Sequence, residues 1–161
     1  MTSIEYKGNE LEIFSRAQHW KNYFGRKLRP FISGDVLEVG AGNGSTTSVL
    51  QSTKVKSWVC LEPDKQLAEQ LHGFALSRPY CQQIEVTHGI LSDLNRQFDT
   101  ILYIDVLEHI QNDQQELKMA ADSLNDGGCL IVLAPAYMKL YSPFDHAIGH
   151  YRRYNQNTLR S

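Results

Sequence analysis

The chain has 161 residues, of which 42% are hydrophobic and 21% are charged, and it shows no biased tract and no internal repeat. This length and composition predict one globular domain over residues 1–161 with a core of its own. The net charge of −2 gives no reason to expect generic attraction to nucleic acid or to anionic membranes, although Lys139, Arg152, Arg153 and Arg160 make residues 139–161 locally basic.

No apolar run approaches the roughly 20 residues that cross a bilayer, and the N-terminus lacks a basic region followed by an apolar stretch. We therefore expect a cytoplasmic protein with no membrane partner. The three cysteines lie far apart and form no Cys-x-x-Cys pair, which argues against a disulfide framework and against a zinc knuckle.

Residues 10–28 space apolar side chains at helical intervals, which predicts an amphipathic helix. Its apolar face is formed by Leu11, Phe14, Ala17, Trp20 or Lys21, Phe24 and Leu28. We expect Gly25 to interrupt this helix and Pro30 to end it, so that residues 1–32 make up an N-terminal helical segment.

Short apolar runs alternate with helical segments in the next part of the chain. Five runs are typical of strands, at residues 35–39, 57–62, 83–88, 99–105 and 129–135. Helices are expected at residues 45–52, 63–76 and 112–124, the last begun by Asn112 or Asp113 and closed by Asn125-Asp126-Gly127-Gly128. This alternation predicts an α/β fold with a doubly wound, mostly parallel sheet as the core of residues 35–135.

A glycine-rich loop follows the first strand, where doubly wound sheets bind ligands beside the point at which the winding reverses. Gly40, Gly42 and Gly44 allow the backbone to turn sharply and to approach a ligand closely. The third glycine comes one residue earlier than in the Gly-x-Gly-x-x-Gly fingerprint of dinucleotide-binding proteins. Glu38 would repel a pyrophosphate and attract an ammonium or a sulfonium, so we interpret the ligand as cationic. A tight turn without a ligand is the alternative.

Two residues at the end of the second strand support a nucleoside ligand. Glu62 lies 22 residues after Gly40, about the distance at which a carboxylate accepts hydrogen bonds from ribose hydroxyls in nucleotide-binding folds. Pro63 follows it and could form one wall against a flat base. An exposed acid at a strand end is the alternative interpretation of Glu62.

Three separate pieces of the chain, Glu38-Val39-Gly40-Ala41-Gly42-Asn43-Gly44, Glu62 and Asp105-Val106-Leu107-Glu108-His109, together resemble the class I S-adenosylmethionine-dependent methyltransferases over residues 35–135. The resemblance implies S-adenosylmethionine as the cofactor, with its ribose at Glu62 and its methionine part at Glu38, Gly40, Ala41, Gly42 and Gly44. It also implies that the adenine lies against Gly89, Ile90 and Leu91, with Pro63 and Asp105 at the edge of the cofactor site. Ile90 departs from the acid or hydroxyl that many members place beside the adenine amine, and it offers only apolar contact and backbone groups.

Asp105, Glu108 and His109 follow the fourth predicted strand and have three interpretations. His109 is a general base, because the pKa of histidine is naturally near neutral. Alternatively, the Asp-x-x-Glu-His spacing holds a divalent metal, as the resemblance to some quinone-precursor O-methyltransferases implies. In the third interpretation the three residues shape the loop and cap the next helix. We predict His109, Asp105 and His150 as catalytic residues and assign no metal ligand.

Residues 136–161 form the predicted substrate-side segment. Residues 142–154, SPFDHAIGHYRRY, resemble a segment found near the substrate mouth in a subgroup of these methyltransferases. Arg152 and Arg153, flanked by tyrosines, are suited to bidentate contacts with a carboxylate or a phosphate, which predicts an anionic acceptor. A solvated loop with buried tyrosine rings is the alternative.

These observations predict an S-adenosylmethionine-dependent methyltransferase that transfers a methyl group to a small, anionic metabolite. An NAD(P)-dependent oxidoreductase of similar architecture and a non-catalytic cofactor-binding module are the alternatives. Methyltransferases of this class have seven strands, so the five predicted here lead us to expect a chain that lacks the last two. The fifth strand would then be an exposed edge, which favours a homodimer.

Overall fold

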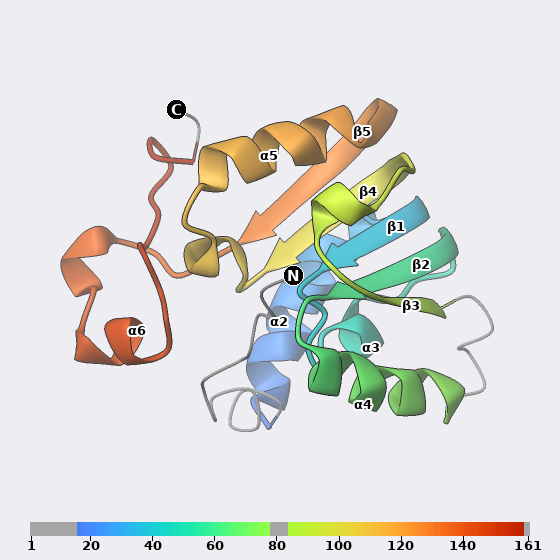
Figure 1. The fold of residues 1–161 in the computed structure, drawn as a ribbon, viewed down its shortest axis with the longest axis horizontal. Coiled ribbons are helices and arrows are strands. Elements are labelled where there is room, and N and C mark those ends of the chain that lie inside the picture. The colour runs from blue at the N-terminus through green and yellow to red at the C-terminus, as the bar shows by residue number, and fades with distance from the viewer. Residues whose placement is uncertain (1–15, 78–83, 160–161) are drawn as a thin grey trace.

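The computed structural model describes residues 16–77 and 84–159. In these residues a five-stranded, parallel sheet has the strand order β3-β2-β1-β4-β5 (Figure 1). The strands are β1 (Gly34–Val39), β2 (Val55–Glu62), β3 (Ile84–His88), β4 (Phe98–Ile104) and β5 (Leu124–Leu133). The five predicted strands are confirmed, and only the start of β5 differs by more than two residues.

Helices connect these strands and follow the last of them. The α-helices are α2 (Gln18–Leu28), α3 (Thr47–Leu50), α4 (Lys65–Leu76), α5 (Asp113–Asp122) and α6 (Pro143–Ala147). Short 3-10 turns lie at η1 (Arg29–Phe31), η3 (Leu91–Asp93), η4 (Leu107–His109) and η5 (Met138–Leu140).

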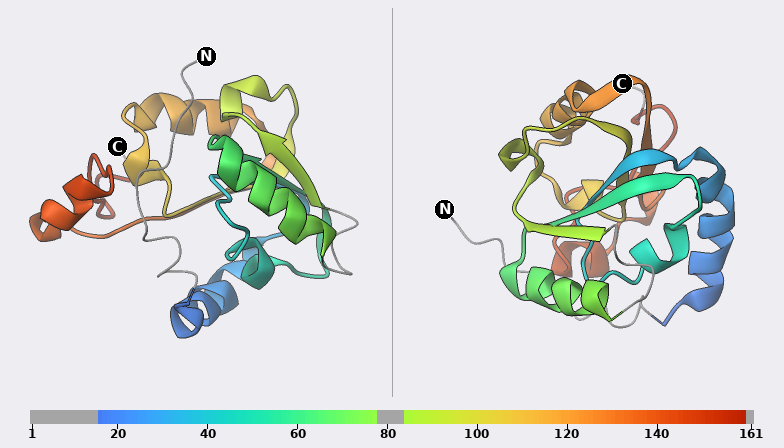
Figure 2. Two further views of the ribbon diagram at one scale, coloured as in Figure 1. Left: turned by 60° about the horizontal axis from the view of Figure 1, so that its bottom comes forward. Right: turned by 90° about the vertical axis from the view of Figure 1, so that its right-hand side faces the viewer.

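Both faces of the sheet are covered, and Figure 2 shows α4 and α5 on opposite sides of it. One buried cluster contains residues of α2, α3 and α4 together with Trp58 of β2, and the other contains residues of η3, η4 and α5 together with Tyr103 of β4. Burial on both faces explains why the strands read as nearly continuous apolar runs. The predicted doubly wound α/β fold is therefore confirmed.

The N-terminal helix differs from its prediction in two ways. The described helix begins at Gln18 and continues through Gly25 without interruption, while Leu11 and Phe14 lie outside the described residues. Gly25 is needed for close packing of α2 on α3, because a Cβ atom there would lie 2.6 Å from Val49 Cγ1. The helix buries Lys21, whereas Trp20 is 46% exposed.

The connection from α5 to β5 was predicted incorrectly. Asn112 caps α5 as expected, by accepting a hydrogen bond from the Gln115 backbone N–H. The helix ends at Asp122, and residues 125–128 belong to the first half of β5 rather than to a helix-ending turn. Pairing with β4 is irregular there, since Phe98 pairs with Leu124 while Thr100 pairs with Cys129. The two glycines thus lie in a stretch of the strand whose pairing is irregular.

The edges of the described sheet are β3 and β5. Pairing of β5 with a second copy of the chain remains a prediction. Among the described residues, none of the helices combines the length and the apolar character that a membrane crossing requires.

Candidate functional site

A cavity of about 320 Å³ lies where β1 and β4 end. These two neighbouring strands are followed by connections to opposite faces of the sheet, so their loops diverge and leave a crevice. The walls come from α2, the glycine loop, the end of β4, η4 and residues 144–153. Segments far apart in the sequence therefore meet at one site.

The glycine loop forms one wall of this cavity. Gly40, Gly42 and Gly44 have φ angles of 66°, 55° and 76°, which belong to the left-handed region that side chains disfavour. A Cβ atom on Gly40 would lie 2.6 Å from Val106 Cγ2, so glycine also permits the close approach of the loops after β1 and β4. Ala41 lies between the glycines and is buried.

Glu62 supports the glycine loop from below. One carboxylate oxygen accepts the Gly42 N–H at 2.8 Å and the other accepts the Asp64 N–H at 2.9 Å. Burial raises the pKa of Glu62, and these two hydrogen bonds oppose the shift. Glu62 is nearly inaccessible and does not line the cavity, yet each oxygen retains a lone pair for a further hydrogen bond.

Glu38 does not face the cavity, in contrast to the expectation that it would meet a cationic ligand directly. Its carboxyl group is buried beneath the loop, where it accepts hydrogen bonds from Thr47 Oγ1 at 2.7 Å and from Trp58 Nε1 at 3.0 Å. Burial raises the pKa of Glu38 to about 7. Its contacts are those of a residue that ties β1 to α3 and β2.

The predicted adenine contacts lie outside this cavity, beyond the ends of β2 and β3. Ile90 is 45% exposed and Leu91 is buried. The Ile90 N–H donates to the Asp93 carboxylate at 2.9 Å, so this backbone group is already in use. The sequence interpretation did not single out Asp93, whose carboxylate lies beside the Ile90 backbone.

Lys21 is a second residue that the sequence interpretation did not single out as functional. It projects from α2, is 5% exposed and lines the cavity, where its Nζ donates a hydrogen bond to Ser45 Oγ. Burial lowers the pKa of Lys21, while Glu38 and Asp105 oppose this shift. Helical spacing could not decide whether Trp20 or Lys21 faces the core, and a buried lysine is the less expected choice.

Asp105 begins the loop after β4 and faces the cavity. Its φ angle of 55° is left-handed, a conformation that costs a non-glycine residue roughly 1–2 kcal/mol, and its N–H donates to the Leu133 carbonyl at 2.8 Å. The surrounding protein raises the pKa of Asp105 to about 6 by partial desolvation, against the opposing effect of Lys21.

Glu108, His109 and His150 come together among the residues that line the cavity. A ligand atom of each lies within 4.8 Å of the others, although His150 is far from the other two in the sequence. Burial, followed by repulsion from Asp105 and Asp145, raises the pKa of Glu108 to about 8. The structure therefore brings two of the predicted catalytic residues, His109 and His150, into one cluster.

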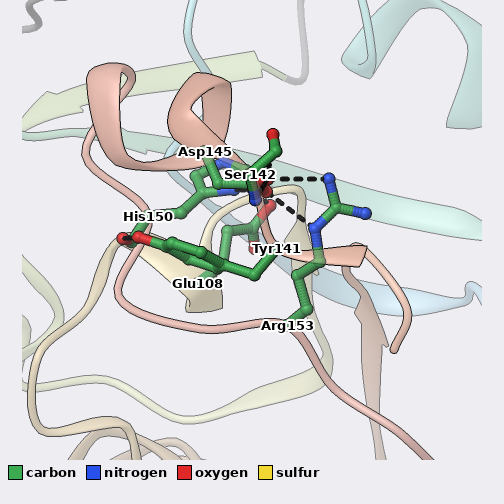
Figure 3. A network of polar contacts seen from close by, with 6 residues as sticks. All are labelled: Glu108, Tyr141, Ser142, Asp145, His150 and Arg153. Carbon is green, nitrogen blue, oxygen red and sulfur yellow. Dashed lines mark hydrogen bonds and ion pairs between the residues drawn. The ribbon is translucent and has the colours of Figure 1, made fainter. Parts of the chain in front are cut away.

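Asp145 organises the segment over this cluster (Figure 3). Its carboxylate accepts two hydrogen bonds from Arg153, at 2.7 and 2.9 Å, and two from Ser142, and its Oδ1 lies 3.0 Å from His150 Nδ1. Hydrogen bonding to Arg153 holds the pKa of Asp145 well below its usual range.

The same contacts remove the basis for an anionic acceptor. The Arg153 guanidinium is held by Asp145 in a bidentate pair. Arg152 forms an ion pair with Asp113 and donates to the Gln111 carbonyl. Both guanidinium groups are therefore engaged by carboxylates of the chain itself, and an anionic metabolite stays a prediction without direct support from these contacts.

The parallel sheet, the glycine loop at the reversal of winding and the acid after β2 define the architecture of class I methyltransferases. A family model described as a methyltransferase domain matches residues 10–160. The chain belongs to this family of S-adenosylmethionine-dependent methyltransferase domains, which confirms the resemblance and the cofactor class expected from the sequence.

Known proteins agree with this assignment. The demethylmenaquinone methyltransferase of Tropheryma whipplei (strain Twist) is 28% identical over 125 residues, which cover 74% of this chain and 49% of the relative. The chain thus spans about half the length of the curated relatives it matches.

Among solved structures, the YcgJ protein of Bacillus subtilis has a TM-score of 0.68 and 18% identity, covering 88% of this chain and 65% of that protein. The glycopeptide N-methyltransferase MtfA, solved with S-adenosyl-L-methionine, has a TM-score of 0.63 and 21% identity, covering 76% of this chain and 53% of that protein. Both likenesses concern the fold.

Proposed function

We propose that the protein transfers a methyl group from S-adenosylmethionine to a small-molecule acceptor that enters the cavity at the ends of β1 and β4. The observation that carries this proposal is the left-handed glycine loop, which forms one wall of a cavity that also contains a buried lysine and a partly desolvated aspartate. Family membership supports the same cofactor.

The residues around the loop fit the amino-acid part of the cofactor. Lys21 provides the cation for its carboxylate, and Asp105 provides the anion for its ammonium group. Gly40, Ala41 and Gly42 line the cavity, and their small size leaves room for the carbon atoms of the cofactor that bear these two groups. Glu38 acts from beneath the loop, as the residue that holds it in place.

The nucleoside part would extend toward the ends of β2 and β3. Glu62 would accept the ribose hydroxyls with the lone pairs that Gly42 and Asp64 leave unused. Gly89, Ile90 and Leu91 would flank the adenine, opposite Pro63.

Binding of the acceptor does not depend on the two arginines of the last segment, because both are already paired with carboxylates. Trp20, Phe24 and Phe144 give the cavity aromatic walls, which suit an apolar or aromatic acceptor. The curated relatives are named for demethylmenaquinone, also a small-molecule acceptor.

The catalytic contribution of the chain is placement of the acceptor and removal of its proton. Bound S-adenosylmethionine supplies an electrophilic methyl group on a sulfonium. Holding the acceptor atom in line at about 3 Å contributes on the order of 7–11 kcal/mol. His109 and His150 line the same cavity and are the side chains that can take up the proton of a hydroxyl, since Asp105 is engaged by the cofactor ammonium group.

Calorimetric titration of the purified chain with S-adenosylhomocysteine and with NAD tests the cofactor. We expect binding of S-adenosylhomocysteine and none of NAD, and the reverse result would favour the oxidoreductase alternative. Incubation with labelled S-adenosylmethionine and candidate hydroxylated aromatic acceptors then tests transfer. Cofactor binding without transfer to any of them would favour the non-catalytic module.

A further inference from the structure

The Asp145 carboxylate is completely buried and is surrounded by hydrogen-bond donors. Its Oδ2 accepts the Ser142 N–H at 2.8 Å, the Ser142 hydroxyl at 2.9 Å and Arg153 Nη2 at 2.9 Å, while its Oδ1 accepts Arg153 Nε at 2.7 Å. A carboxylate in such a set of bonds is ionised, and an ionised carboxylate can only accept hydrogen bonds.

This constraint decides where the proton of the neighbouring imidazole ring lies. His150 Nδ1 lies 3.0 Å from Asp145 Oδ1 (Figure 3). Because the carboxylate has no proton to give, Nδ1 is the donor of this hydrogen bond. The neutral ring then has its lone pair on Nε2, which lies 3.9 Å from Glu108 Oε1, too far for a hydrogen bond. A histidine in water prefers the opposite tautomer, so Asp145 selects the less common one.

The backbone and the ring plane of His150 are also held. Its N–H donates to the Asp145 carbonyl at 2.9 Å, and its carbonyl accepts the Tyr141 hydroxyl at 2.6 Å. The ring of His109 packs edge-on against the His150 ring, with centroids 4.5 Å apart and an interplanar angle of 84°. These contacts keep Nε2 on the side of Glu108, at the cavity that His150 and Glu108 both line.

We propose that Asp145 is a positioning residue that fixes His150 in the Nδ1–H tautomer, and that Nε2 of His150 is the atom that takes up the proton of the acceptor. Arg153 and Ser142 contribute by holding the carboxylate in place. Arg153 was expected to bind an anion, and its bidentate contact with Asp145 gives it this different role. His109 is then a packing partner of the ring rather than a second base.

The use of His150 rests on the proposed methyltransferase function, whereas its tautomer does not. Nε2 forms an N–H bond as the O–H bond of the acceptor breaks, and the freed oxygen electron pair bonds to the methyl carbon. The electron pair of the C–S bond leaves with sulfur, so that the sulfonium becomes a neutral thioether. The imidazolium ring still donates its Nδ1–H to the anionic Asp145, which stabilises the new positive charge.

NMR of the whole chain, labelled with ¹⁵N in histidine, tests the tautomer without an acceptor. At about pH 9, well above the ordinary histidine pKa of about 6.5, correlations between ring nitrogens and ring protons show which nitrogen carries a hydrogen. We expect Nδ1–H for His150 and Nε2–H for His72, an exposed histidine on α4 that serves as the reference. The spectrum of His150→Gln identifies the signals of His150.

Substitution of Asp145 tests its role as the selector. Three of the four donors from Ser142 and Arg153 converge on Oδ2, so the amide oxygen of an asparagine takes that place and its NH₂ group faces His150 Nδ1. Asp145→Asn should therefore move the proton of His150 to Nε2. Asp122→Asn, the same chemical change at an exposed residue of α5, should leave the Nδ1–H tautomer in place.

Methyl transfer supplies the second measurement, from labelled S-adenosylmethionine to the hydroxylated aromatic acceptors. Asp145→Asn should lower kcat by about 100-fold or more and keep KM within about threefold, because it removes proton uptake rather than binding. Asp122→Asn should keep both constants within about twofold.

An Nε2–H or charged His150 ring in the unmodified chain would overturn the proposal. So would an Nδ1–H tautomer, or an unchanged kcat, in folded Asp145→Asn. Circular dichroism shows whether this variant is folded, and the spectrum of the unmodified chain decides the tautomer where it is not. Each chain is also titrated with S-adenosylhomocysteine. Cofactor binding with the wrong tautomer removes this inference alone, whereas an unmodified chain that binds no cofactor or transfers no methyl group removes the proposed function and, with it, proton uptake by His150.

Discussion

Lys21 offers the sharpest test of how the cofactor lies in the cavity. Its Nζ is held beside the glycine loop by Ser45, and among the cations that line the cavity Arg153 is already paired with Asp145. Lys21 is therefore the cation available to the carboxylate of the methionine part. Replacing it by methionine preserves much of the side-chain volume and removes the charge.

The expected loss follows from the burial of Lys21. At 5% exposure the ion pair with a ligand carboxylate is little screened by solvent, so a hydrogen bond to a charged group, about 1.5–3 kcal/mol, sets the scale. Lys21→Met should then raise the Kd of S-adenosylhomocysteine by about 10-fold to 150-fold. The exposed Lys65 on α4 supplies the matched control, and Lys65→Met should change the Kd by less than about twofold.

The assay is isothermal titration with two ligands, S-adenosylhomocysteine and its decarboxylated analogue. The analogue lacks the group that Lys21 is expected to bind, so the substitution should leave its affinity nearly unchanged. An equal loss for both ligands would mean that Lys21 supports the loop rather than the carboxylate. No loss for either would refute the reasoning.

Three further substitutions test the supports of the glycine loop. Glu62→Ala should weaken S-adenosylhomocysteine binding by about 1–3 kcal/mol in the same titration, because hydrogen bonds to a charged group are lost. Gly40→Ala should lower the free energy of unfolding in urea by roughly 1–3 kcal/mol, since φ is positive and Val106 is in the way, whereas Gly73→Ala on α4 meets no neighbour within 4 Å and should not destabilise. Glu38→Gln should remove a loss of stability that the unmodified chain shows as pH rises from 5 to 8. The pKa of Glu38 in the folded protein, about 7, lies above the ordinary glutamate value of 4.5. The neutral form therefore stabilises the fold at low pH, and this contribution, roughly 2–3 kcal/mol, is lost as pH rises through 7.

Each of these expectations has a contrary outcome. Unchanged cofactor affinity in Glu62→Ala would leave that residue as a support of the loop only. Equal stabilities of Gly40→Ala and Gly73→Ala would show that the loop tolerates a side chain. Parallel pH profiles of the unmodified chain and Glu38→Gln would show that Glu38 is ionised in the folded protein at neutral pH.

The sheet could be predicted from the sequence because its signals are local. A strand buried on both faces is a short apolar run whatever it packs against, and a glycine-rich turn must follow it where the backbone becomes left-handed. Residues 125–128 show the limit of this approach. Two glycines after a helix are typical of its end, yet here they belong to β5, in the stretch where its pairing with β4 is irregular.

The site was less predictable, because its residues come together through contacts that spacing does not record. The paired arginines are one case: Asp145 holds Arg153 and Asp113 holds Arg152, so two residues that looked available to an anion are not. Glu38 is another, since its position before the glycine loop suggested a ligand contact but its hydrogen bonds point into the core.

The two sides of the cavity are built by different means, and this difference bears on specificity. The cofactor side is formed by turns that leave the central strands directly, so its shape is tied to the sheet. The proposed acceptor side is residues 136–154, whose bridge between Ala136 and Tyr154 lies within the segment itself. The Tyr151 N–H donates to the Glu108 carbonyl at 2.8 Å and the Tyr154 N–H to the Pro135 carbonyl at 2.9 Å, and side chains make further contacts. The buried Tyr154 hydroxyl donates to Asp113 at 2.8 Å and lies 3.2 Å from the Leu107 carbonyl oxygen, which anchors the end of this segment to η4 and α5. Sequence changes between Asp145 and Tyr154 can therefore alter the acceptor without disturbing the sheet, and the choice of acceptor should follow this segment.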